Sequence, residues 1–189
     1  MVDVAVVGGG PAGLSAALFT AKNDLDTVLF DTDETWMHKA HLFNYLGIRS
    51  IDGGEFVDLA RGQTEDRGAD LREEEVEAVE ETGEGFTVTT DEDEYEATYV
   101  VLATGADRSL AEDAGCAFSE DDTVEADLGM ETSVEGLYAT GAMVRAEEWQ
   151  AVISAGDGAA AALNILSTEK GEHYHDFDVP DDTVRNPGA

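Results

Sequence analysis

The fold is decided by residues 2–31, which read VDVAVVGGGPAGLSAALFTAKNDLDTVLFD. A short apolar run at Val2–Val7 stops at a glycine-rich turn, after which Leu14–Lys22 is rich in alanine and leucine. Pro11 stands where a helix would begin, and Thr27–Phe30 is a second apolar run. Proline suits the first turn of a helix, and strands buried on both faces have nearly continuous apolar runs. The order strand, turn, helix, strand predicts an α/β domain with a central parallel sheet.

The turn contains the pattern Gly8-x-Gly10-x-x-Gly13, and the second strand ends at Asp31. The pattern alone is a weak signal, but in this order of elements it is typical of dinucleotide-binding turns. We expect Gly8 to allow the tight turn, Gly10 to admit a pyrophosphate and Gly13 to let the helix approach the strand. The helix N-terminus would attract the diphosphate, and Asp31 would accept hydrogen bonds from ribose hydroxyls. A glycine-rich turn without a ligand is the alternative.

The later segments complete the expected domain. From Leu71 onward, alternating apolar and polar positions separated by turns predict a small antiparallel meander, with strands at Phe86–Thr90 and Tyr95–Thr98. The further expected elements are a helix over 55–66, apolar strands at Tyr99–Ala103 and Leu137–Ala139, and a helix over Glu147–Thr168.

With these motifs, the sequence resembles the FAD domain of thioredoxin-reductase-like flavoproteins, within the pyridine nucleotide-disulfide oxidoreductase family. The segments that carry the resemblance are Val6–Gly13, Asn44–Gly47, Asp52–Phe56, Val101–Gly105, Gly136–Gly141, Trp149–Ala151 and Gly156–Ala161. The resemblance implies a Rossmann-like FAD/NAD(P)-binding domain over residues 1–168, followed by an acidic tail over residues 169–189. The residues that it implies as FAD contacts are Gly8, Gly10, Pro11, Ala12, Gly13, Asp31, Ala103, Thr104, Gly105, Gly141, Ala142, Gln150 and Ala151.

The sequence departs from the family pattern between Gly105 and Gly136. Family members carry an NAD(P)H domain of roughly a hundred residues at this place, whereas this interval holds only about 30 residues. The sequence has no second glycine fingerprint, and its single cysteine, Cys116, excludes an intramolecular Cys-x-x-Cys pair. We therefore expect an FAD domain that lacks the NAD(P)H domain and has no dithiol chemistry of its own.

Two positions near the flavin also differ from the family. The family has an acidic residue that bonds a ribityl hydroxyl where this sequence has Ala142, and an arginine where it has Trp149. Losing one charge-assisted hydrogen bond costs about 1.5–3 kcal/mol, which weakens binding about ten- to a hundredfold. Trp149 would either stack near the flavin or pack against the protein. The helix start near Gln150 and Ala151 is implied to face the flavin and to stabilise negative charge on it.

The composition is strongly acidic, with 10 Lys plus Arg against 43 Asp plus Glu and a net charge of −33. This charge repels nucleic acid and anionic lipid surfaces, so we expect neither as a partner. No apolar run reaches membrane-spanning length and the start shows no signal-peptide pattern, which favours a cytoplasmic protein. The acids spread along the whole chain, which favours a halophilic protein from a high-salt cytoplasm. The alternative, an acidic patch for a basic partner, would be localised.

We expect an FAD-dependent oxidoreductase, and the resemblance implies a homodimer. Its electrons would come from an external donor, such as a nicotinamide nucleotide, a ferredoxin or another protein, and pass to an unidentified acceptor. Two alternatives stay open. The first is a non-catalytic dinucleotide-binding or regulatory module, and the second is the FAD half of a split reductase whose NAD(P)H domain is a separate chain.

Several residues with chemical potential have two interpretations. His38 and His41 lie in the loop after the second strand, and His173 and His175 lie in the acidic tail. His38 and His41 would approach the flavin edge, bind a metal or belong to an ordinary polar loop, and His173 and His175 would form a metal site or belong to a solvated tail. The ordinary interpretation is favoured for both pairs, so no metal site is predicted. Cys116 is either a small buried residue, which is commoner, or a thiol that forms mixed disulfides. No catalytic residue is identified from the sequence.

Overall fold

The structure is a computed structural model that describes residues 1–177. Its strands are β1 (Val2–Val7), β2 (Thr27–Phe30), β3 (His41–Leu42), β4 (Ile51–Asp52), β5 (Asp70–Arg72), β6 (Val76–Thr82), β7 (Gly85–Thr90), β8 (Glu94–Leu102) and β9 (Leu137–Ala139). Its helices are α1 (Pro11–Lys22), α2 (Gly53–Glu65), α3 (Ser109–Asp113) and α4 (Ala151–Lys170), with short 3-10 helices η1 (Trp36–Lys39) and η2 (Gly141–Val144). The predicted α/β class, with a parallel central sheet and a small antiparallel meander, is confirmed.

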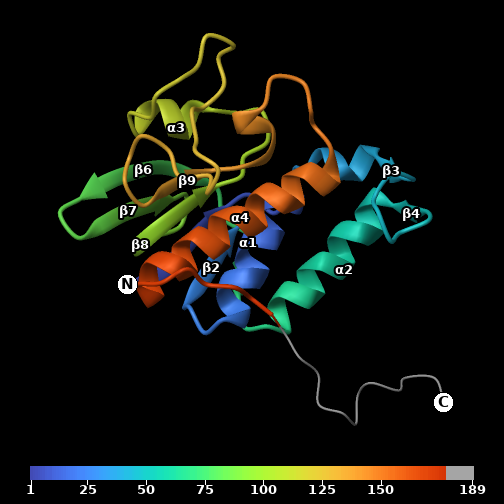
Figure 1. The fold of residues 1–189 in the computed structure, drawn as a ribbon, viewed down its shortest axis with the longest axis horizontal. Coiled ribbons are helices and arrows are strands. Elements are labelled where there is room, and N and C mark those ends of the chain that lie inside the picture. The colour runs from blue at the N-terminus through green and yellow to red at the C-terminus, as the bar shows by residue number, and fades with distance from the viewer. Residues whose placement is uncertain (178–189) are drawn as a thin grey trace.

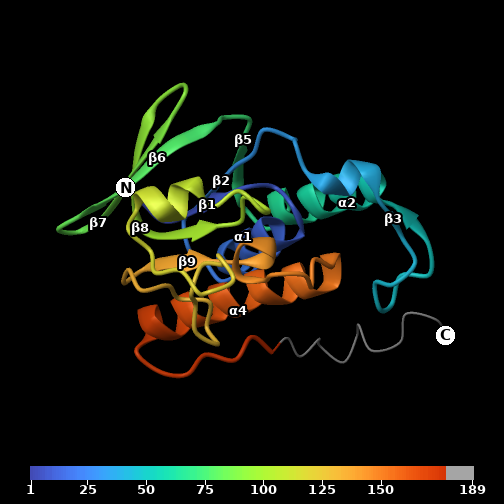
Figure 2. The same cartoon turned by 90° about the horizontal axis from the view of Figure 1, so that it is seen from above.

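The main sheet has the strand order β5-β2-β1-β8-β7-β6, and β9 pairs with β8. Strand β1 lies between two parallel neighbours, because Val6 is opposite both Leu29 of β2 and Val101 of β8. Strands β6, β7 and β8 form the antiparallel meander as a continuation of the same sheet. Helices α1 and α4 lie on one face of the parallel strands and α3 lies on the other (Figure 1, Figure 2).

Two apolar clusters fill the two faces of the sheet. Val4 and Val6 of β1 pack with residues of α1, α2 and α4, including Ile165. Ala5 and Val7 of β1 point to the other face, where they join the meander and α3. Strand β1 is therefore buried on both faces, which is why its sequence is apolar without alternation.

Strand β8 differs from the prediction of separate strands at Tyr95–Thr98 and Tyr99–Ala103. It is one strand of nine residues. Along one edge its first half pairs antiparallel with β7 and its second half pairs parallel with β9, where Leu102 is opposite Ala139. The opposite edge pairs with β1. Burial changes from alternating to continuous along β8 because the neighbouring strand changes from β7 to β9. It does not mark the boundary between two strands.

Strand β5 was predicted as the beginning of the meander, and the structure instead pairs it parallel with β2. Leu71 of β5 is opposite Leu29 of β2. The strand has only three residues, and Asp70 and Arg72 on either side of Leu71 are exposed. So short a strand, with a single apolar residue, has no periodicity that sequence reasoning could detect.

Helix α4 begins at Ala151, four residues after the predicted start at Glu147. Gln150 precedes it in an extended conformation, with φ of −122° and ψ of 138°. The residues before it form a loop, in which Trp149 donates from Nε1 to the Arg145 carbonyl oxygen at 2.9 Å. Acidic residues such as Glu147 suit a helix N-terminus, which is why the local sequence indicated an earlier start. In this loop the Trp149 ring also packs against that of Trp36, with the ring centroids 5.4 Å apart.

The end of α4 and the residues after it also extend the prediction. The helix runs to Lys170, two residues beyond the predicted end, and Gly171 closes it in the left-handed conformation with φ of 66°. The following chain contacts the end of α1, where Lys22 Nζ donates to Asp176 Oδ1 at 2.7 Å. The first residues of the predicted acidic tail are therefore packed against the domain. The rest of that tail, residues 178–189, lies outside the described residues.

Helices α1 and α4 approach each other closely because α4 has a glycine at the contact. A Cβ atom on Gly158 would lie 2.0 Å from the Ala12 carbonyl oxygen and 3.1 Å from the Ala16 amide nitrogen. A Cβ atom on Gly156 would meet nothing within 4 Å among the described residues. Gly158 therefore allows the close packing that a glycine inside a helix suggests. That a partner subunit packs against Gly156 stays a prediction.

The contact predicts opposite effects for two alanine substitutions in the same helix. Gly158→Ala should lower the free energy of unfolding by about 1–3 kcal/mol, because the new methyl group must displace the α1 backbone. Gly156→Ala is the matched control and should raise it by up to about 1 kcal/mol through better helix propensity. Urea unfolding of both variants in molar KCl measures the difference. Equal effects at the two positions would contradict the packing.

Candidate functional site

A cleft of about 820 Å³ opens at the carboxyl ends of the parallel strands. Its volume lies in the range of about 300–1,000 Å³ typical of small-molecule sites. The walls are formed by residues that directly follow β1, β2 and β8, and by the turn after β9, which is the usual ligand position in an open α/β sheet. The predicted residues that line the cleft are Gly8, Gly10, Pro11, Ala12, Asp31, Ala103, Thr104, Gly105, Gly141, Ala142, Gln150 and Ala151.

Three glycines of the turn are required by the fold itself. Gly8 has a positive φ of 107°, and a Cβ atom there would lie 2.4 Å from the Ala103 carbonyl oxygen. A Cβ atom on Gly13 would lie 1.8 Å from the Gly8 carbonyl oxygen, and one on Gly9 would lie 2.1 Å from Asp31 Oδ2. Gly13 therefore lies beneath the cleft and fixes the distance between α1 and the end of β1.

Gly10 is different, because the protein itself does not demand a glycine there. A Cβ atom would meet only Thr35 Oγ1, at 3.4 Å, and the residue faces the cleft. The first intrahelical hydrogen bond of α1 runs from the Leu14 amide to the Gly10 carbonyl oxygen at 3.0 Å. The preceding amides of Ala12 and Gly13 belong to the first turn, whose N–H groups have no acceptor within the helix. Open space beside Gly10 and these amides form a cradle that fits a diphosphate.

Asp31 stands at the end of β2 and is held by two protein donors. Its Oδ1 accepts from the Gly9 amide at 3.0 Å, and its Oδ2 accepts from Arg61 Nη2 of α2. A carboxylate offers about four acceptor positions, so it retains capacity for ribose hydroxyls. Arg61 also donates to Asp33 Oδ1 at 2.6 Å. The hydrogen bond from His38, and then that from Arg61, hold the pKa of Asp33 below its usual value.

The opposite end of the cleft is bridged by two contacts. The rings of Trp36 in η1 and Trp149 in the loop before α4 lie 5.4 Å apart, inclined at 50°. Beside them, Asn44 Nδ2 donates to Gln150 Oε1 at 2.8 Å. Trp36, Asn44, Trp149 and Gln150 all line the cleft. Trp149 therefore packs against a second aromatic residue while keeping one face at the site.

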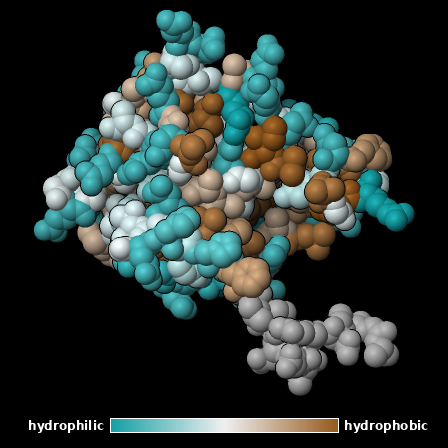
Figure 3. Space-filling view, viewed as in Figure 1, coloured by the Kyte–Doolittle hydropathy of each residue, from teal (hydrophilic) through white to brown (hydrophobic). Residues whose placement is uncertain are grey.

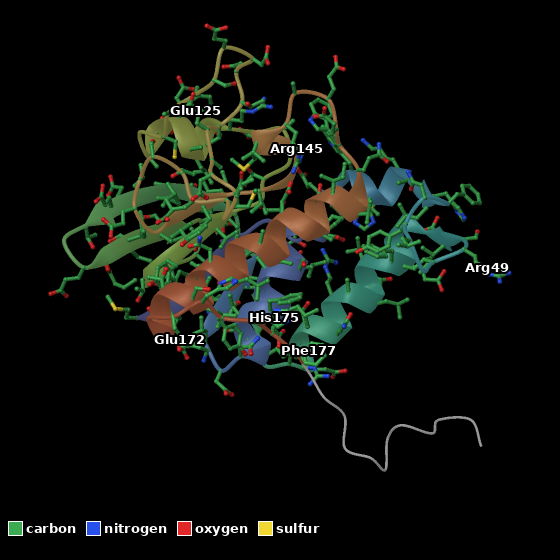
Figure 4. The ribbon with its side chains drawn as sticks, in the orientation of Figure 1. Arg49, Glu125, Arg145, Glu172, His175 and Phe177 are labelled. Carbon is green, nitrogen blue, oxygen red and sulfur yellow. The ribbon has the colours of Figure 1, made fainter. Side chains whose placement is uncertain are left out.

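An ion pair between the partly exposed Arg145 and the buried Asp157 ties the loop that carries Trp149 to α4. Arg145 donates to Asp157 of α4 from Nε to Oδ2 at 2.9 Å and from Nη2 to Oδ1 at 2.6 Å. The Asp157 side chain is only 8% exposed, and the paired hydrogen bonds raise the pKa of Arg145. Figure 4 shows Arg145 beside the start of α4, at the base of the loop. The pair holds the loop in place over the cleft.

A second buried acid stiffens the wall near Asp31. The Glu74 carboxylate accepts from Thr90 Oγ1 at 2.7 Å and from the Tyr95 hydroxyl at 2.9 Å. The guanidinium of Arg72 lies over the Tyr95 ring, 5.3 Å from its centroid. Glu74 lines the cleft where β5 leads into β6. These contacts join residues from four places in the sequence, so no local pattern could have predicted them.

The other residues with chemical potential have ordinary surroundings. His38 Nε2 lies 2.7 Å from Asp33 Oδ1, and His41 Nε2 lies 2.9 Å from Ser50 Oγ. Within residues 1–177, no group of three or more His, Cys, Asp or Glu side chains is placed to hold a metal ion. Cys116 is buried, and burial raises the pKa of its thiol, which fits the interpretation of a small core residue.

Two further observations bear on the expectations. Ala142, which stands in place of the family's acid, is 9% exposed, and its carbonyl oxygen accepts from Arg108 Nη2 at 3.2 Å. No helix among residues 1–177 is long and apolar enough to span a bilayer.

Comparison with known proteins gives the same picture. The pyridine nucleotide-disulphide oxidoreductase family matches residues 2–53 and 48–158. The thioredoxin reductase of Mycolicibacterium smegmatis is 37% identical over 108 residues, which cover 55% of this chain and 35% of that protein. That of Listeria monocytogenes is 33% identical over 108 residues, covering 56% and 34%. The chain thus spans about a third of the length of these curated relatives.

Solved structures share the fold at low sequence identity. The atypical thioredoxin reductase TRi from Desulfovibrio vulgaris Hildenborough has a TM-score of 0.83 and 18% identity, covering 91% of this chain and 99% of that one. A ferredoxin-flavin thioredoxin reductase from Clostridium acetobutylicum has a TM-score of 0.79 and 19% identity, covering 90% and 99%. The chain belongs to the pyridine nucleotide-disulphide oxidoreductase family, whose thioredoxin-reductase-like members are FAD-binding flavoproteins.

Proposed function

We propose that this protein binds FAD in the cleft and acts as an oxidoreductase that takes electrons from an external donor and passes them to a separate acceptor. The observation that carries the proposal is the cradle at Gly10. There the fold leaves open space that the diphosphate of a dinucleotide would occupy. This space lies directly in front of the first backbone amides of α1. Twelve of the thirteen predicted contact residues line this one cleft, and Gly13 supports it from below.

The chain's own residues divide the work along the cleft. The amides of Ala12 and Gly13 would hold the diphosphate, and Asp31 would accept from the ribose hydroxyls of the adenosine half. At the other end, the first turn of α4 at Ala151 lines the cleft, and its dipole would favour negative charge there. When bound, FAD supplies reversible electron transfer.

An external electron donor is proposed because the interval between Gly105 and Gly136 is too short for an NAD(P)H domain. The structure fills this interval with the short helix α3, an isolated bridge between Phe118 and Val124, and the buried Cys116. This supports a single FAD domain over residues 1–168 without an inserted NAD(P)H domain. The single cysteine supports the absence of internal dithiol exchange. Electrons would then come from a nicotinamide nucleotide, a ferredoxin or another protein.

The setting of the protein is part of the proposal. Acidic residues along the whole chain support a high-salt cytoplasm, where screening removes their mutual repulsion. A homodimer is proposed from the resemblance. The open space beside Gly156 on α4 leaves room for a partner there.

Ala142 favours a second candidate function, a non-catalytic dinucleotide-binding or regulatory module. Replacing the family's acid removes one bond to FAD, and a site with weakened FAD affinity could serve to sense a nucleotide. The third possibility, the FAD half of a split reductase, requires a separate NAD(P)H-binding chain, which a pull-down at high salt would recover.

The first test is the visible absorption spectrum of the protein purified in molar KCl. Flavin bands at about one FAD per chain, which bleach reversibly on photoreduction, are expected for the oxidoreductase. A colourless protein that stays colourless after reconstitution with FAD would overturn FAD binding and leave the binding module.

Restoring the acid should strengthen FAD binding. Ala142→Asp is expected to raise FAD affinity about ten- to a hundredfold, because the new carboxylate regains a charge-assisted hydrogen bond to the ribityl chain. Quenching of tryptophan fluorescence measures the affinity, since both tryptophans of the chain line the cleft. Ala106→Asp, which adds the same charge to another wall residue, is the control and should not strengthen binding. Equal effects of the two variants would refute the role of position 142.

FAD affinity should rise with salt. Within residues 1–177, no Lys or Arg side chain lines the cleft, whereas Asp31, Glu75, Glu77 and other acids do. A dianionic diphosphate is therefore repelled at low salt, and shortening the Debye length from about 10 Å to about 3 Å removes that cost. We expect about a tenfold gain between 0.1 M and molar KCl, with the fold verified at each salt by circular dichroism. The Glu75→Gln variant should bind FAD more tightly than the unaltered protein at 0.1 M KCl but not at molar KCl. An FAD affinity that falls as KCl rises would contradict this explanation.

A further inference from the structure

An exposed apolar surface borders the end of the cleft where α4 begins. It consists of Trp36, Phe43, Leu46, Trp149 and Val152, which are between 40% and 92% exposed. We call this surface the apolar rim. Figure 3 shows apolar side chains gathered over the start of α4 and toward β3. Large apolar side chains exposed together, next to a binding site, indicate a surface that another molecule covers.

Two contacts join the two parts of the apolar rim, which are far apart in sequence. The rings of Trp36 and Trp149 join them at 5.4 Å, and the hydrogen bond between Asn44 and Gln150 joins them again. Phe43 extends the surface along β3, where its ring lies 4.5 Å from that of His41. Since Trp36 and Trp149 also line the cleft, a molecule on the rim would touch residues of the site itself.

The charge of this region differs from that of the rest of the protein. Residues 35–51 contain none of the 43 acidic residues, but they contain Lys39 and Arg49. Both side chains are exposed, and Figure 4 shows Arg49 projecting outward from the end of the molecule. Glu34 and Asp52 flank this stretch in sequence, and Glu147 and Glu148 precede Trp149. Lys39 and Arg49 nevertheless give this part of a chain of net charge −33 two exposed cations that would attract an acidic molecule at contact distance.

We propose that the apolar rim, with Lys39 and Arg49, docks an acidic protein that carries electrons and donates them to FAD at this end of the cleft. The proposal rests on the proposed function. Two molecules of a one-electron carrier would each lose one electron, and FAD would gain both together with two protons from solvent. In molar salt, the apolar contacts supply most of the affinity and the two cations act only at contact distance.

The test uses an acidic [2Fe–2S] ferredoxin as the probe and the full-length protein loaded with FAD in molar KCl. Ferredoxin binding is measured by biolayer interferometry with the oxidised probe, and flavin bleaching is measured after mixing with the reduced probe. Two variants alter the surface, F43S/L46S and K39E/R49E. Two single-substitution controls, Leu128→Ser on a side chain that is 96% exposed and Arg67→Glu on an exposed turn, make the same kind of change once elsewhere.

The expected result is a loss of ferredoxin affinity of about tenfold or more in both surface variants, with both controls within about twofold of the unaltered protein. Flavin bleaching by reduced ferredoxin should slow in parallel, while photoreduction of the bound flavin stays unchanged in every variant. Ferredoxin binding that is unaffected by the surface variants overturns the proposal. So does a dimer of the unaltered protein, seen by sedimentation, that F43S/L46S dissociates, because the rim would then be covered by a second copy. Failure of FAD binding itself appears in the absorption spectrum and is separate from these outcomes.

Discussion

The site depends on one steric constraint, the close approach of the α1 N-terminus to the ends of β1 and β8. Gly13 lies against the Gly8 carbonyl oxygen, and Gly8 lies against the Ala103 carbonyl oxygen, at distances that no side chain allows. Because of this approach, the first amides of α1 face the carboxyl edge of the sheet. The same helix then accepts α4 at Ala12, through Gly158. Gly8 and Gly13 thus position α1 at the floor of the cleft, and Gly158 positions α4, at its far wall, against α1.

The elements that sequence reasoning predicted correctly are those whose signal is local. Strands β1 and β2 have the predicted bounds, because their apolar runs are bounded by a glycine turn and by Asp31. The expected roles of Gly8 and Gly13 rest on the glycine spacing within the order strand, turn, helix, and both glycines make close contacts in the structure. The start of α4 was predicted too early because the acidic residues before it satisfy a local rule, whereas Trp149 lies in a loop and packs against the ring of Trp36.

The rest of the site depends on pairs that are distant in sequence. Arg61 reaches Asp31 across 30 residues, and Asn44 reaches Gln150 across 106 residues. No periodicity or motif connects such positions, because they meet only after the sheet and helices have packed.

The acidity of the chain and the design of the cleft fit together physically. A protein with 43 acidic residues and only 10 Lys plus Arg has few cationic side chains to place against a phosphate. Among the described residues, Lys22, Arg61, Arg72 and Arg145 are held in ion pairs with carboxylates. Backbone amides and a helix dipole attract an anion without a countercharged side chain, and they persist when salt screens distant charges. A glycine cradle is therefore the kind of phosphate site that such a composition can retain. The stretch at 35–51, which has no acid and carries the exposed Lys39 and Arg49, is a place beside the cleft where cationic side chains are left at the surface.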